Sequence, residues 1–141
     1  MVEVLRLRDG PASEAEPVSL DSFLDDSDGG AVRIEAGDDV ERLFPVLDRL
    51  QLVEIDFPRF RDGRGFSSAR MLREAGYRGE VRATGDVLVD LVWFMQRCGF
   101  DSFAPDVPLN PAEVEAALAR YPHVYQPAAD GRVPVWALRH G

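Results

Sequence analysis

Apolar and polar residues alternate along the chain with two different periods, and the change of period predicts the order of the elements. A period of two is typical of half-buried strands, whereas apolar residues three and four apart form one face of a helix. We expect strands at residues 2–8, 31–35, 52–57, 80–84 and 102–104, and further extended pieces at 123–126 and 133–139. Helices are expected at about residues 39–50, 66–75, 86–98 and 111–121.

The expected helices have recognisable first and last residues. Asp38 is expected to cap the first helix, because a glutamate three residues later completes a capping box. Asp86 is expected to cap the third helix, and Asn110 followed by proline is a strong start for the fourth. Gly76 and Gly99 stand where a glycine commonly ends a helix.

The order of these elements predicts a single α/β domain. Strands that alternate with helices across short connections imply right-handed crossovers and a mostly parallel sheet. The pattern leaves open whether the sheet is open or curled like half a barrel. We assign residues 1–30 to an N-terminal strand and an acidic connector, which has room for a short helical turn around Leu20–Leu24, and residues 31–141 to the α/β domain.

The expected helix at residues 86–98 is apolar on almost every side. Its only charged residues are Asp86, Asp90 and Arg97, and they lie close to one face. A helix of this kind is covered by protein on most sides. In so small a domain, this indicates a central position or a buried subunit contact, and we expect a homodimer.

Composition limits the chemistry that the chain can perform. It has 141 residues, a net charge of -9 and no lysine, since all its basic residues are arginines. An acidic chain is unsuited to general nucleic-acid binding, and a chain without lysine forms neither a Schiff base nor a Walker-type phosphate loop. One cysteine (Cys98) and two histidines (His123 and His140) leave little material for a disulfide or a metal centre. We therefore expect no cofactor and no metal.

The sequence also indicates the cellular compartment of the protein. The first residues do not resemble a signal peptide, because no basic region precedes a long apolar core. The most apolar stretch, at residues 87–95, contains an aspartate and is about half as long as the roughly 20 residues that a membrane span needs. We expect a cytoplasmic protein that contacts neither a membrane nor nucleic acid.

One segment of the chain is positively charged. Residues 51–82 contain seven arginines and five acidic residues, and within them a loop follows a strand and precedes a helix. Ligands of parallel α/β sheets gather at the carboxyl ends of strands, where the next helix N-terminus offers N–H groups to an anion. We predict an anion- or partner-binding site from this loop and its neighbours: Asp56, Arg59, Arg61, Asp62, Gly63, Arg64, Gly65, Ser67, Arg70, Arg82, Gly85 and Asp86. The alternative is a surface whose arginines pair with nearby acids.

Other candidate groups have simpler interpretations. Asp86 and Asp90 are one helical turn apart and could share proton-transfer work, but acidic residues are common at helix starts, and we favour that interpretation. Cys98 ends an apolar helix, so we expect a buried, inert thiol. No residue is assigned a catalytic role.

Residues 57–103 resemble the signature of a bacterial family, the domain-of-unknown-function family numbered nine-three-four. They read FPRFRDGRGFSSARMLREAGYRGEVRATGDVLVDLVWFMQRCGFDSF, where members commonly read F-P-K-F-x-D-G-R-G-Y-S-x-A-R, then G-E-L-R-A-x-G-D-V-L-x-D-Q and R-C-G-F-D. Arg59, Phe66 and Leu91 stand where lysine, tyrosine and glutamine are usual. A role that needs a phenol hydroxyl at position 66 cannot operate in this chain.

The resemblance also implies a function. Members are typically encoded beside assimilatory sulfite reductase and adenylyl-sulfate reductase, and some are labelled oxidoreductases. This implies an accessory protein of assimilatory sulfate or sulfite reduction, which binds a sulfur oxyanion or a partner reductase through the arginine-rich loop. The alternative is a small α/β enzyme, such as an oxidoreductase, that acts on an anionic substrate with Asp56, Arg64 and Asp86. A flavin or nucleotide is disfavoured, because R-D-G-R-G is not the dinucleotide fingerprint.

Overall fold

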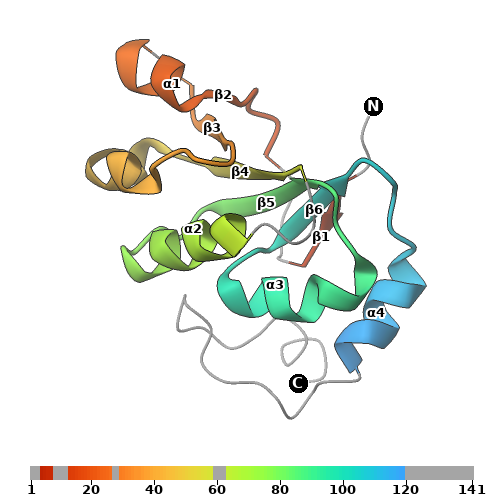
Figure 1. Cartoon of the computed structure of the whole chain (residues 1–141). Helices are drawn as coiled ribbons and strands as arrows, with labels where there is room; N and C mark the ends of the chain where they lie inside the picture. Colours follow the sequence, from red (N-terminus) through yellow and green to blue (C-terminus); the bar gives the residue numbers. More distant parts are fainter. Residues whose placement is uncertain (1–3, 8–12, 27–28, 59–62, 120–141) are drawn as a thin grey trace.

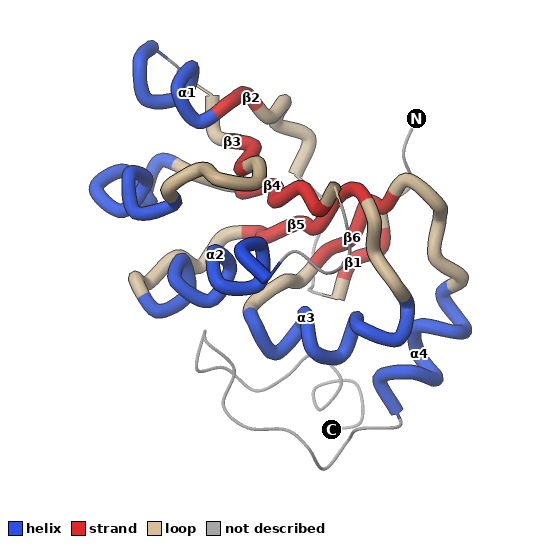
Figure 2. The backbone as a smooth tube through the Cα atoms, in the orientation of Figure 1, coloured by secondary structure: helices blue, strands red, loops and turns tan. Residues whose placement is uncertain are grey.

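The computed structural model describes residues 4–7, 13–26, 29–58 and 63–119, and in these ranges six strands form one sheet (Figures 1 and 2). The strands are β1 (Leu5–Arg6), β2 (Val18–Ser19), β3 (Ala31–Ile34), β4 (Leu52–Phe57), β5 (Glu80–Gly85) and β6 (Ser102–Pro105). The α-helices are α1 (Leu20–Asp26), α2 (Gly63–Glu74), α3 (Val92–Cys98) and α4 (Pro111–Ala119). Two 3-10 helices complete the described elements, η1 (Val40–Arg49) and η2 (Val89–Leu91).

The sheet is almost entirely parallel. Its order is β1-β6-β5-β4-β3-β2, and only β1 runs antiparallel, against β6. The five parallel strands follow one another in chain order, and because crossovers of this kind are right-handed, their helices lie on one face of the sheet. Figure 1 shows α2 and α3 side by side on that face. The expected α/β fold with a mostly parallel sheet is confirmed.

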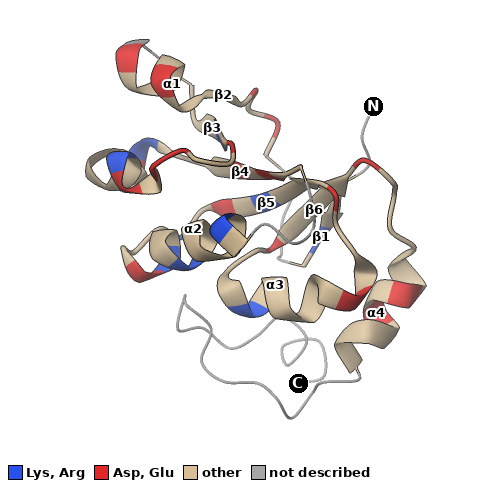
Figure 3. Ribbon diagram, viewed as in Figure 1, with Lys and Arg blue, Asp and Glu red and all other residues tan. Residues whose placement is uncertain are grey.

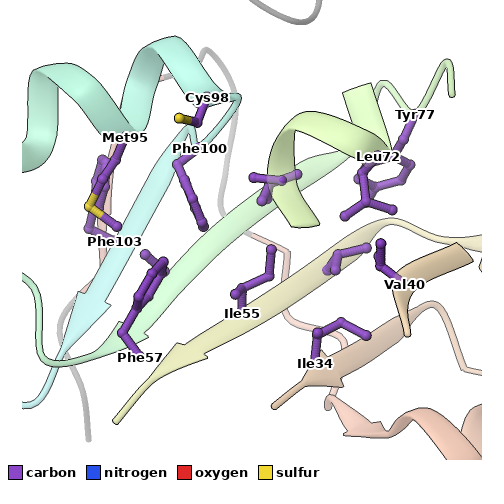
Figure 4. Close-up of a cluster of buried hydrophobic side chains, with 14 of the residues drawn as sticks. Ile34, Val40, Ile55, Phe57, Leu72, Tyr77, Met95, Cys98, Phe100 and Phe103 are labelled. Carbon is purple, nitrogen blue, oxygen red and sulfur yellow. The ribbon is translucent and has the colours of Figure 1, made fainter. Parts of the chain in front are cut away.

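The face beneath the helices forms the apolar core (Figure 4). One row of side chains crosses four strands in register: Ile34, Ile55, Ala83 and Phe103. Leu72 of α2 and Met95 of α3 belong to the same cluster and are almost fully buried. The alternation of apolar residues in β3 and β4 therefore predicts correctly which side of each strand meets the helices.

The helix expected at residues 86–98 begins later than its sequence indicates. The backbone N–H of Asp86 donates to the carbonyl oxygen of Phe57 at 2.7 Å, which ties Asp86 to the end of β4. Helical structure starts only at η2 and continues in α3 to Cys98, as expected, with Gly99 at the C-cap. The prediction that Asp86 caps this helix was wrong, because a bond between strand ends outweighs a local capping signal.

The first expected helix is also different. Asp39 rather than Asp38 caps η1, since its side chain accepts from the N–H of Glu41 at 3.0 Å. The segment is a 3-10 helix with a non-helical residue after Pro45, which has no N–H to donate to an α-helical bond. Gly76 lies beyond the end of α2 with φ +101°, as expected for a helix end.

The N-terminal region belongs to the same sheet. β1 lies at one edge of the sheet and β2 at the opposite edge, so the chain between them runs from edge to edge. On the way, the N–H of Ser13 donates to Glu80 at 3.1 Å, and the carbonyl oxygen of Ser13 accepts from Arg82 at 3.4 Å. The short helical turn expected around Leu20–Leu24 is α1. The extended pieces expected at 123–126 and 133–139 lie outside the described residues.

Candidate functional site

A small pocket lies at the carboxyl ends of β3 and β4, beside the first turn of α2. This is the edge at which ligands of parallel α/β sheets gather. The polar and glycine residues in its wall come from the loop after β3, from β4 and from α2: Glu35, Gly37, Asp38, Asp56, Arg64, Gly65 and Ser68. The structure thus brings three of the predicted site residues, Asp56, Arg64 and Gly65, to one pocket.

The positive side of this pocket is formed by α2. The helix is 12 residues long, carries no acidic residue in its first turn and begins with Gly63, Arg64 and Gly65. Its first N–H groups have no partner within the helix, and the helix dipole makes this end positive. Gly37 has φ +93°, and a Cβ atom there would lie 3.9 Å from Nη1 of Arg64. The guanidinium group therefore reaches the loop that follows β3.

Gly65 sets how closely α2 approaches the sheet. A Cβ atom at this position would overlap the ring of Phe57, which is itself buried. The ring of Phe66 packs against the same side chain, with centroids 5.2 Å apart. A glycine is thus required here for contact between backbone and ring, and this contact fixes the start of α2 at the end of β4.

The ends of β4 and β5 are joined by polar contacts. The hydroxyl of Thr84 donates to Oδ1 of Asp56 at 3.1 Å, and the N–H of Asp86 donates to Phe57 as described above. Gly85 is buried and has φ +86°. Asp56, Gly85 and Asp86 therefore lie at the same edge of the sheet, as the sequence predicts for consecutive parallel strands.

The remaining predicted residues lie in several places. Ser67 is exposed, and the hydroxyl in the pocket wall belongs to Ser68, which the sequence analysis did not name. Ser68 follows Arg64 by four residues, and this spacing places two side chains on one helical face. Arg70 points toward Cys98, with Nη2 3.9 Å from Sγ. Three further residues of the predicted site lie outside the described ranges and stay a prediction: Arg59, Arg61 and Asp62.

Arg82 belongs to a row of ionic side chains on the face of the sheet opposite the helices. Its Nη2 lies 2.8 Å from Glu80 and its Nη1 3.8 Å from Glu54. Glu54 also accepts from Arg33 at 2.6 Å, and Glu80 from Arg6 at 3.2 Å. We call these five residues the ionic row. Arg82 is buried and bonded within the ionic row. Its part in the predicted anion site stays a prediction.

Glu80 is the most strongly held carboxylate of the ionic row. Burial acts to raise its pKa, but hydrogen bonds from the Ser102 hydroxyl, the Ser13 N–H and Arg82 outweigh burial, and the pKa of Glu80 is lowered below its ordinary value of 4.5. The Ser102 hydroxyl lies 2.7 Å from the carboxylate. A group with a lowered pKa stabilises the folded state above its unfolded-state pKa, and this contribution is lost as the pH falls through the folded-state value.

We expect the free energy of unfolding to decrease as the pH falls below about 4.5. In the variant Ser102→Ala, Glu80 loses one donor, so its pKa should rise toward the ordinary value and the dependence on acid pH should become shallower. Urea denaturation at a series of acid pH values measures this. Ser22→Ala, an exposed serine on α1, is the matched control. Equal pH dependence in both variants would contradict the role given to Glu80.

Arg73 is also internal. Its side chain is 1% exposed and donates to the carbonyl oxygens of Tyr77, Gly79 and Gly99 at 2.7–3.0 Å, and to Asp101 at 3.1 Å. Asp101 in turn accepts from the N–H of Val81 at 2.9 Å. Two of the seven arginines of the positive segment, Arg73 and Arg82, therefore hold the fold together and leave the segment's surface less basic than its composition indicates.

Cys98 is buried as expected, and Asp90 lies in the first turn of η2, whereas Asp86 caps no helix. The thiol of Cys98 is buried, and burial raises its pKa although Arg70 and Arg97 act in the opposite direction. Asp90 lies in η2 and is exposed, as is Asp86. Among the described residues, no three histidine, cysteine or acidic side chains gather as a metal site would require. In the same ranges, no helix has the length and apolar character to cross a membrane.

Comparison with known proteins identifies a family and no closer relative. Neither a curated protein nor a solved structure matches the chain. The family model described as "Bacterial protein of unknown function (DUF934)" matches residues 31–136, three-quarters of the chain and the whole of the described pocket. The match agrees with the motif resemblance of residues 57–103, and the chain belongs to this family.

Proposed function

We propose that the pocket beside α2 holds a small oxyanion, and that the protein is an accessory component of assimilatory sulfate or sulfite reduction. The observation that carries the first part is the meeting of Arg64, Ser68 and the N-terminus of α2 in one pocket at the carboxyl edge of the sheet. A guanidinium group, a hydroxyl and the N–H groups of a helix N-terminus are donors that bind oxyanions in proteins.

The acidic residues of the pocket indicate which oxyanion it prefers. Asp56 and Asp38 lie in the same wall as Arg64. Each already accepts one hydrogen bond, from Thr84 and from the N–H of Glu35 respectively. A carboxylate repels a fully ionised anion but accepts a hydrogen bond from one that still carries a proton. The site should therefore prefer hydrogen sulfite or hydrogen phosphate to sulfate, which has no proton to donate near neutral pH.

The sulfur pathway is supported by the family resemblance rather than by geometry. The resemblance implies that relatives with this motif are encoded beside sulfite reductase and adenylyl-sulfate reductase. Reduction of sulfite takes haem and iron–sulfur chemistry, and a chain with one cysteine offers few ligands for it. We therefore favour an accessory role, in which the protein holds the oxyanion for a reductase or contacts the reductase itself.

Calorimetric titration tests the oxyanion site. Wild-type protein should bind sulfite with measurable heat, and Arg64→Ala should bind at least about tenfold more weakly, since a charge-assisted bond contributes roughly 1.5–3 kcal/mol. Sulfate should bind more weakly than sulfite to the wild type. Arg78→Ala, in the connection between α2 and β5, is the control, because Arg78 is also exposed but lies away from the pocket.

Equal heats for wild type and Arg64→Ala would contradict the site. The pathway is tested separately, by growth of a deletion strain on sulfate or on cysteine as sole sulfur source. A strain that grows equally well on both would remove the sulfur assignment and leave the anion site standing.

One observation favours the alternative of a small enzyme on an anionic substrate. Asp56 is half-buried and lies in the same pocket as Arg64, so a bound anion would stand beside a carboxylate able to exchange a proton with it. Asp56→Asn separates the two functions. An enzyme would lose turnover and keep its anion, whereas an accessory protein would change only in its preference for protonated anions.

A further inference from the structure

The helices on the covered face of the sheet form a row in which α3 lies between α2 and α4 (Figure 1). The three elements differ in the side chains that they expose. Residues of α2 and the end of α3 contribute arginines, the start of α3 contributes aromatic rings, and η2 with α4 contributes acids. Figure 3 shows basic residues on α2 and α3 and acidic residues before α3 and on α4, while α2 also carries the exposed Glu74 at its last position.

The aromatic part of the row runs from the core to the surface. Phe66 packs on the buried Phe57, Phe94 packs on Phe66 with centroids 5.2 Å apart, and Trp93 packs on Phe94 at 5.9 Å. Phe66, Trp93 and Phe94 are all partly exposed. Partly exposed aromatic residues that pack against a core are typical of the centre of a protein interface.

The basic part consists of Arg70 and Arg97. Within the described residues, neither forms an ion pair: Arg70 contacts the sulfur of Cys98 at 3.9 Å, and Arg97 lies over the ring of Trp93 at 5.8 Å. Arg97 directly precedes Cys98 in the chain, so both arginines belong to the part of the row where α2 meets the end of α3. Four other arginines, by contrast, each form an ion pair with a carboxylate: Arg6, Arg33, Arg42 and Arg82.

The acidic part lies at the other end of the row. From residue 98 to 119 the chain contains no arginine, and the exposed acids of this edge are Asp86, Asp90, Asp106, Glu113 and Glu115. Two large apolar side chains are exposed among them, Leu88 at 39% and Val107 at 76%. Acidic side chains that surround exposed apolar ones complement a surface of arginines and aromatic rings.

We propose that this helical row is the interface of a two-fold symmetric homodimer. In such an interface, the same patch is used by both copies, so each residue pair occurs twice. A two-fold axis that passes near α3 places the arginines of α2 and α3 opposite the acids of η2 and α4 of the second copy, on both sides of the axis. The aromatic rings of Trp93 and Phe94 then meet at the centre. No further copy can add to the dimer through this surface, because the basic part and the acidic part of each copy both contact the other copy.

The charge gradient explains why the occupant is a second copy. An arginine-bearing face on a chain of net charge -9 needs an acidic partner, and the same chain carries one beside that face. The proposal is independent of the oxyanion site, since Arg64 and Ser68 take no part in it.

Sedimentation velocity on the full chain tests the dimer. Wild-type protein is expected to dimerise, and the dimer should weaken as salt is added. The variant Arg70→Glu/Arg97→Glu should associate at least about tenfold more weakly, because it places like charges opposite each other. The control Arg42→Glu/Arg49→Glu makes the same change of charge on η1 and should leave the dimer unchanged. Circular dichroism confirms that each variant is folded.

A mixing experiment tests the pairing itself. Asp106→Arg/Glu113→Arg should also associate more weakly than wild type, but an equimolar mixture with Arg70→Glu/Arg97→Glu should re-form a dimer, since each reversed acid meets a reversed base. A wild type that stays monomeric at low salt would overturn the proposal. So would a dimer that survives the arginine reversal, or a mixture of the two variants that stays monomeric.

Discussion

Replacing Arg73 by methionine is expected to lower the free energy of unfolding by about 3–5 kcal/mol, the usual cost of removing one partner of a buried ion pair. The Arg73 side chain donates to three carbonyl oxygens and to Asp101, and it is shielded from solvent, since it is 1% exposed. Methionine fills a similar volume without donors, so the variant leaves a buried carboxylate and three carbonyl groups without this donor. Urea denaturation at neutral pH measures the loss.

The matched control is Arg42→Met on η1. Arg42 forms an ion pair of 2.9 Å with Asp21, but both side chains are about half exposed or more, so the change should cost less than about 1 kcal/mol. The double variant Arg73→Met/Asp101→Asn should recover part of the loss, because the asparagine carries no charge. A cost for Arg73→Met as small as that for Arg42→Met would show that the buried network contributes little.

The partners of Arg73 could not be predicted from the sequence. As part of the segment 51–82 it contributes to an apparent positive patch, and its partners at Gly99 and Asp101 are more than 20 residues away along the chain. The same holds for Arg82, whose partner Glu54 lies on the neighbouring strand. No local pattern identifies which arginine meets which carboxylate, because strand register decides that.

The elements that the sequence predicts correctly are those with a strong hydrophobic period. The strands at 52–57 and 80–84 alternate over five or six residues, and both are present in the structure. β2 has two residues, too few for a period to appear, and η1 is a 3-10 helix around Pro45. The sequence predicts part of the pocket wall, because the loop between β4 and α2 lies at the carboxyl edge of the strands in any parallel sheet. The contributions of Gly37 and Asp38 could not be foreseen, since they depend on β3 lying beside β4.

Replacing Gly85 by alanine is expected to have the second large effect. Gly85 has φ +86°, in the left-handed region, where a residue with a Cβ atom costs about 1–2 kcal/mol. That Cβ atom would also overlap the carbonyl oxygen of Phe57. The contact is with backbone, which cannot move aside as a side chain can, so overpacking adds about 1–3 kcal/mol.

Gly76→Ala separates the two contributions. Gly76 has φ +101°, yet a Cβ atom added there would have no neighbouring atom within 4 Å, so this variant meets only the backbone strain. Gly85→Ala should therefore be less stable than Gly76→Ala in urea denaturation, by roughly 1–3 kcal/mol. Because the clash falls on Phe57, next to Asp56, the variant should also weaken sulfite binding, whereas Gly76→Ala should not. Equal stability and equal sulfite binding in the two variants would mean that the ends of β4 and β5 can separate freely, and the pocket would then lack the rigid edge on which its selectivity depends.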